Sequence, residues 1–151
     1  MKRLLSLAAF ALVTACSAGG TAAPARVDVA DAICRPAAPG RDVTGCYVTL
    51  TASRNDRLVS AASPSARALQ IHEMKSADGM MQMSELPDGL PLPAGEAVHL
   101  APGGNHIMLL GATGSLATGG TIPVTLTFEH APAQQVTFRI AQPATAEHSG
   151  H

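Results

Sequence analysis

The sequence predicts an all-β sandwich with Greek-key connections, folded as a single domain. Apolar and polar residues alternate with a period of two along several segments, which is typical of half-buried strands, and no long amphipathic helical pattern occurs. Groups of Pro, Gly and Asp separate these segments, as turns separate short strands. Seven or more short strands at such regular spacing indicate a β-sandwich.

Three segments show the alternation most clearly: YVTLTA at 47–52, VTLTFEH at 124–130 and QVTFRI at 135–140. Shorter strands are expected at 68–72, 97–100 and 106–110, with turns at 37–40, 87–89, 93–95, 102–104 and 119–120. The chain contains only four aromatic residues, one Tyr and three Phe. Its core must therefore be built from Val, Leu, Ile and Ala.

The N-terminus has the features of an export signal. A basic start precedes an apolar run at 4–13, which is too short to span a bilayer as a helix of about 20 residues. The small residues before Cys16 resemble a bacterial lipobox, in which the cysteine receives the lipid; plain cleavage to a soluble product is the alternative. We expect a signal peptide at 1–15, a lipid anchor at Cys16 and a location in the periplasm or cell envelope.

The rest of the chain divides into a tether, a domain and a tail. Residues 16–25 are small and polar, as expected of a flexible tether, and residues 26–141 form the β-sandwich domain. Residues 142–151 lack an apolar period and are expected to form a disordered tail that contains histidines. Without the signal, the chain loses two of its ten basic residues and none of its eleven acidic ones, which leaves a formal net charge of −3. This charge argues against a nucleic-acid partner, which would call for a basic patch.

Two cysteines remain if Cys16 takes a lipid, and an even pair in an oxidising compartment indicates a disulfide. Eleven residues separate Cys34 from Cys46. Closing such a loop contributes on the order of 3 kcal/mol to stability by restricting the unfolded chain. A thiolate copper or redox site is the alternative, but this spacing is not a standard metal-binding signature.

Histidine and methionine are concentrated in two segments, IHEMKSADGMMQM at 71–83 and NHIML at 105–109. Side chains two apart on a strand share a face. His106 and Met108 therefore point one way, whereas Ile107 and Leu109 point to the core. His72 and Met74 repeat this spacing, while Met80, Met81 and Met83 lie in an intervening loop or hairpin.

This composition favours a soft metal ion. Thioether sulfur is a poor ligand for Mg²⁺, Ca²⁺ or Zn²⁺ and a good one for Cu(I), and imidazole completes a mixed nitrogen and sulfur set. No cysteine lies near the cluster, and a blue-copper electron-transfer centre requires a thiolate. The set therefore favours carrying Cu(I) over cycling electrons. The alternative is that these methionines are ordinary apolar residues of a β-rich core.

The segments HEMKSADGMMQM, LPAGEAVHLAPGGNHIMLLG and GGTIPVTLTFE resemble periplasmic copper chaperones of the PCu(A)C family. The resemblance covers about 27–140, and its specific part is a His followed by a Met and then by a His-x-Met pair. It implies a cupredoxin-like β-sandwich that binds Cu(I) near its surface. It implies that the ligands are His72, Met83, His106 and Met108, with Met74 at an optional position.

The resemblance also implies a role in delivery. Cu(I) would pass to the dinuclear copper centre of cytochrome c oxidase or to another metallochaperone. Apart from the resemblance, we expect the protein to be a monomer. A shallow site would let the partner's ligands attack the metal before the old ligands leave, so we expect His106 and Met108 to be partly exposed. The cysteine pair and the lipobox lie outside the basic pattern of the family.

The remaining histidines are weaker candidates for metal ligands. Some family members carry His- and Met-rich C-terminal extensions that bind Cu(II), which makes His148 and His151 candidates for a second site. A short polar tail that binds metal adventitiously is the alternative. His99 and His130 are expected at the surface, without a metal-binding role.

Other functions have less support in the sequence. His72 and Glu73 are not followed by the second histidine of an H-E-x-x-H motif, and no G-x-S-x-G motif occurs, so an enzyme is not expected. A metal-free envelope lipoprotein that binds another protein is one alternative. A copper-sequestering protein for tolerance is another, because storage and delivery use the same ligands.

Overall fold

The computed structural model describes residues 22–144, and all the regular elements in this range are β-strands. The ten strands are β1 (Val27–Cys34), β2 (Val43–Ala52), β3 (Asp56–Ala62), β4 (Ala66–Ala77), β5 (Met80–Glu85), β6 (Leu90–Leu92), β7 (Ala97–Leu100), β8 (His106–Ala112), β9 (Thr121–Phe128) and β10 (Gln134–Ile140). The all-β prediction is therefore confirmed. Nothing helical in the described part of the chain is long or apolar enough to span a bilayer. The predicted signal, Cys16 and the tail histidines His148 and His151 lie outside the described residues.

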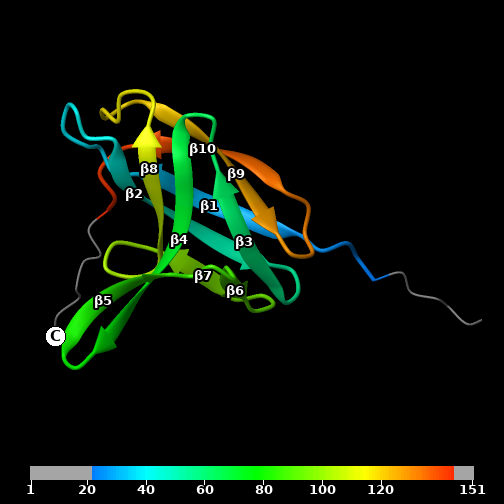
Figure 1. Ribbon diagram of the computed structural model, residues 1–151. Helices are drawn as coiled ribbons and strands as arrows, with labels where there is room; N and C mark the ends of the chain where they lie inside the picture. Colours follow the sequence, from blue (N-terminus) through cyan, green and yellow to red (C-terminus); the bar gives the residue numbers. More distant parts are fainter. Residues whose placement is uncertain (1–21, 145–151) are drawn as a thin grey trace, which may run out of the picture.

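The strands form one mixed sheet that folds back on itself into a sandwich. Their order is β5-β4-β8-β2-β1-β10-β9-β3-β6, and β7 also pairs with β2. Strand β1 connects the two halves, because it pairs antiparallel with β2 and parallel with β10. A bulge between Ala30 and Ile33, with Asp31 at a φ of 55°, bends β1 between these partners. Strands β3 and β4 lie side by side without pairing, which closes the sandwich (Figure 1).

The core follows the alternation read from the sequence. The fully buried side chains come mostly from the aliphatic positions of β2, β8, β9 and β10, with Phe138 as the largest. One departure is Tyr47, which alternation places with Thr49 and Thr51 but which is buried. Its ring folds over Gly45, where a Cβ would lie 3.0 Å from the Tyr47 hydroxyl, so the missing side chain makes room for the ring.

Cys34 and Cys46 lie directly opposite each other on β1 and β2 and form a disulfide, as the sequence predicts. Both cysteines are fully buried. The bond therefore lies inside the sandwich and joins two neighbouring strands.

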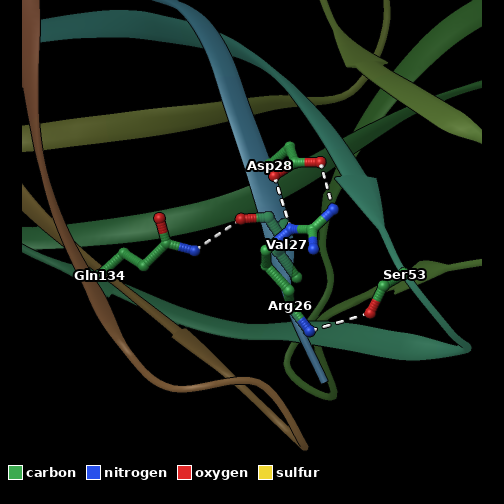
Figure 2. Close-up of polar contacts among 5 residues, drawn as sticks. All are labelled: Arg26, Val27, Asp28, Ser53 and Gln134. Carbon is green, nitrogen blue, oxygen red and sulfur yellow. Dashed lines mark hydrogen bonds and ion pairs between the residues drawn. The ribbon is translucent and has the colours of Figure 1, made fainter. Parts of the chain in front are cut away.

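Polar contacts hold the start of β1 in place (Figure 2). The backbone amide of Arg26 donates to the Ser53 hydroxyl at 3.0 Å, and the Gln134 side-chain amide donates to the Val27 carbonyl at 2.7 Å. The exposed ion pair between Arg26 and Asp28 adds little, because water screens it. These contacts connect the first strand to the β2–β3 turn and to β10.

A buried carboxylate connects the start of β3 to the β9–β10 connection. Asp56 Oδ1 accepts hydrogen bonds from the amides of Arg57 (2.7 Å) and His130 (3.0 Å), and Oδ2 accepts one from the amide of Ala131 (2.9 Å). Burial raises the pKa of Asp56, but these three amides, with the nearby His130 side chain, lower it by more, so the net pKa lies below 3.8.

Candidate metal centre

Strands β5, β4 and β8 are neighbours in the sheet and place the predicted ligands on one of its faces. In an antiparallel pair, directly opposite residues share a face, with Cβ atoms about 4.5–5.5 Å apart. The opposite pairs across β4 that carry predicted ligands are His72 with His106, Met74 with Met83 and Gln70 with Met108. Residues two apart on a strand also share a face. The predicted set therefore lies on a single surface of these three strands.

The methionines at 80–83 lie on the second strand of a hairpin that projects from the body of the sandwich (Figure 1). The turn residues Asp78 and Gly79 have φ values of 52° and 76°. Two successive left-handed residues, with the sequence Asp-Gly, form the tight turn that matches the twist of a β-hairpin. The expected loop or hairpin is thus a hairpin, and Met80, Met81 and Met83 are all exposed.

The two histidines face each other across β4 and β8. Their ring centroids lie 5.5 Å apart, with an angle of 70° between the ring planes. His106 Nδ1 lies 2.9 Å from the Gly104 carbonyl. A carbonyl only accepts, so in the neutral ring Nδ1 carries the proton and Nε2 keeps its lone pair.

His72 forms its hydrogen bond through the other ring nitrogen. Its Nε2 lies 3.1 Å from Gln70 Oε1, which accepts, so Nδ1 keeps the lone pair. This Nδ1 atom is buried and has no hydrogen-bond partner among the described residues. A buried nitrogen without a partner is costly and calls for an explanation. A metal ion would supply the missing partner, since metal-binding histidines commonly use one nitrogen for the metal and the other for an orienting hydrogen bond.

The local environment keeps the His72 ring neutral. Burial lowers the pKa of His72 below 6.5, the neighbouring His106 lowers it further, and Glu85 on the opposite strand partly offsets both effects. Only a neutral imidazole binds a metal ion. The ring is therefore in its ligand form near neutral pH.

The exposure of the site differs from the expectation. Met108 is half-buried, as expected, but the prediction that His106 is partly exposed is wrong, since only 8% of it is accessible. The His106 ring packs against His72 on one side and bonds to the preceding loop at Gly104 on the other. The accessible members of the predicted set are the thioethers, with Met83 at 51%.

The donor set is soft. Among residues 22–144 no group of three or more His, Cys, Asp or Glu side chains is placed to hold a metal ion. The face carries two imidazoles with methionines beside them, and Glu85 lies opposite His72. The imidazole and thioether donors suit Cu(I) and not hard cations. The disulfide removes the thiols of Cys34 and Cys46 from consideration as ligands.

Two orienting residues were missed by the sequence reasoning. Gln70 and Gly104 each bind one nitrogen of a candidate ligand. The period-two pattern contained a signal for Gln70, which precedes His72 by two residues on the same strand face. His99 and His130 are exposed, as expected.

The chain is similar to known proteins, both in sequence and in fold. The family model described as "Putative lipoprotein LpqE-like" matches residues 27–140. The chain belongs to the LpqE-like family. One curated relative, "Putative lipoprotein Lxx21020" of Leifsonia xyli subsp. xyli, is 42% identical over 93 residues, which are 60% of this chain and 56% of that protein. The aligned region thus spans little more than half the length of that relative.

Two solved structures are similar in fold to this LpqE-like chain and show the type of its β-sandwich. The copper-bound PCuAC domain from PmoF2 has a TM-score of 0.63 at 24% identity, over 78% of this chain and 93% of that one. The Cu(I) form of DR1885 from Deinococcus radiodurans has a TM-score of 0.62 at 26% identity, over 84% and 85% of the two chains. The cupredoxin-like fold and the resemblance to PCuAC proteins are therefore confirmed.

Proposed function

We propose that this protein is an exported copper chaperone that binds Cu(I) through His72, Met83, His106 and Met108. The observation that carries the proposal is the His72–His106 pair on neighbouring strands, in which one nitrogen of each ring is hydrogen-bonded and leaves the other to face a metal ion. Methionines occupy the adjacent positions on the same face. The similar DR1885 structure, at 26% identity, is a Cu(I) form, which supports this choice of metal.

The ligand set suits a carrier and not an enzyme. All four ligands are uncharged, so the loaded site keeps the single positive charge of Cu(I). The exposed Met83 is the ligand that a partner's side chains can displace first, while the buried histidines still hold the metal. Copper would pass in this way to the dinuclear centre of cytochrome c oxidase or to another metallochaperone. Met74, opposite Met83, is an additional candidate ligand.

The proposal places the protein in the cell envelope. The lipoprotein names of the family and of the relative support export and lipid attachment at Cys16 after removal of 1–15. The domain would then be held near a membrane by the segment at 16–25. His148 and His151 are proposed as a second site, for Cu(II).

The test is a Cu(I) competition titration under reducing, anaerobic conditions. The wild-type protein should bind one equivalent tightly, and the Met83→Leu/Met108→Leu variant should lose at least 100-fold in affinity, because leucine keeps the volume but removes the sulfur donor. Met80→Leu is the matched control, since Met80 is on the same strand but faces the other way. Binding that is absent, or unchanged in the double variant, would favour a metal-free envelope interaction module.

A further inference from the structure

The methionine face extends beyond the four proposed ligands, toward the tip of the hairpin. Met81 lies opposite Ser76, just as Met83 lies opposite Met74. Opposite residues share a face, and so do residues two apart on one strand. Met81 therefore lies on the same face as His72, Met74 and Met83, one step farther out.

Met81 is also accessible to a partner. It is 58% exposed, and β5 is an edge strand whose six side chains are all exposed. Along a strand, residues two apart are separated by about 6.5–7 Å. Methionine is unbranched and flexible, so its sulfur samples much of this gap. A Cu(I) ion at Met83 is therefore one ligand exchange away from Met81.

Charge distinguishes the two faces of the hairpin. The only basic residue between 74 and 83 is Lys75, which alternates with Met74 and so lies on the opposite face. Met80, opposite Ala77, shares the face of Lys75. Lys75 is ion-paired with Glu73, which shares its face, whereas the Met81 face carries the carboxylate of Glu85 opposite His72. A cation that moves along the hairpin would therefore meet an ion pair on the Met80 face and no basic side chain of the hairpin on the Met81 face.

We propose that Met81 is a transfer ligand, which takes Cu(I) from the buried histidines and presents it to a partner at the hairpin tip. This inference rests on the function proposed above. In the step, a lone pair of the Met81 sulfur binds Cu(I) as the Met108 sulfur leaves. The nitrogens of His72 and His106 then leave in turn as the partner's own ligands bind the metal. Copper remains Cu(I), and no electron or proton moves, because every ligand is neutral.

The test compares the rate of copper release with the equilibrium affinity. The purified full chain is loaded with one equivalent of Cu(I) and mixed with bathocuproine disulfonate in an anaerobic stopped-flow instrument. Met81→Leu should slow transfer to the chelator at least fivefold and leave the dissociation constant within twofold of the wild type. Met80→Leu, the matched control on the same strand, should change neither quantity.

Three results would overturn the inference. Transfer from Met81→Leu at the wild-type rate would make Met81 an ordinary surface residue. Equal slowing by Met80→Leu and Met81→Leu would indicate a general effect of the hairpin surface. A loss of affinity in Met81→Leu as large as that in Met83→Leu would make Met81 an equilibrium ligand. If the wild-type protein binds no Cu(I), that result would contradict the proposed function itself, and this inference would fail with it.

Discussion

At the scale of single residues, one hydrogen bond per ring decides which nitrogen of each candidate histidine ligand is available. The Gly104 carbonyl accepts a hydrogen bond from Nδ1–H of His106, and Gln70 Oε1 accepts one from Nε2–H of His72. The free nitrogens are thus Nε2 of one ring and Nδ1 of the other. Because the protein already holds both rings in these tautomers, little reorganisation is needed when a metal ion arrives.

A residue-scale prediction concerns Asp56, whose two oxygens accept hydrogen bonds from three backbone amides. Asp56→Asn should destabilise the protein by about 2–3 kcal/mol, because the new NH₂ group would face an amide donor and the charged acceptor would be lost. Urea unfolding at pH 7 measures the loss. Asp28→Asn, at an exposed carboxylate, is the control and should change stability little.

The same carboxylate predicts a pH dependence. The pKa of Asp56 is lower in the folded protein than its ordinary value of 3.8. Its contribution is therefore fully present above about pH 3.8 and is lost as the pH falls through the folded-state pKa. The stability difference between the wild type and Asp56→Asn should shrink below pH 3.8, and a difference that stays constant would contradict this account.

At the scale of elements, the β4–β5 hairpin is the most independent part of the described structure. It lies at one edge of the sheet, and none of the side chains of β5 is buried. Its geometry depends on cross-strand bonds to β4 and on the Asp-Gly turn. Such a segment opens locally without unfolding the core. This is the element that presents Met83 and Met81.

A substitution at Gly79 tests whether the turn holds the hairpin closed. Gly79→Val should strain the turn by about 1–2 kcal/mol, because a β-branched residue is disfavoured at the left-handed φ of 76°. Hydrogen exchange of the β5 amides should become roughly 5- to 30-fold faster, with little change in the urea midpoint. Gly114→Val is the matched control, since Gly114 is not left-handed and has open space around it. Unchanged exchange in β5 would mean that the turn does not limit the hairpin.

At the scale of the whole molecule, the sandwich depends on β1, which pairs with strands of both halves. The Cys34–Cys46 disulfide joins β1 to β2 within the core, and β2 also pairs with β8. The disulfide thus stabilises the framework on which His106 and Met108 are displayed. It contributes no atom to the proposed ligand set.

Cys34→Ala/Cys46→Ala should therefore lose about 3 kcal/mol of stability in urea unfolding and keep one Cu(I) equivalent per chain. The loss follows from the greater freedom of the unfolded chain, and copper binding survives because the ligands lie elsewhere. The same unfolding measurement on the wild type under reducing conditions is the control. A fall in copper stoichiometry with the fold intact would instead support the thiolate site considered from the sequence.

Local patterns in the sequence were sufficient to predict the strands and part of the candidate site. The alternation of Val124, Leu126 and Phe128 predicted a strand, which ends at Phe128 and not at residue 130. The His-x-Met spacing likewise predicted that His106 and Met108 share a face, with Ile107 and Leu109 in the core. These inferences succeed because side-chain direction along a strand depends only on its own residues.

The tertiary structure alone decided how far the ligands are buried and which of them meet. Burial of His106 depends on His72, a residue from another strand, and on Gly104 in the preceding loop. The register that places His72 opposite His106, and Met74 opposite Met83, comes from pairings of β4 with two other strands. Register between separate strands is set by the packing of the whole sheet, which no local period encodes. The sequence by itself therefore determined the kinds of ligand and their strands, and the fold decided their partners and their access to solvent.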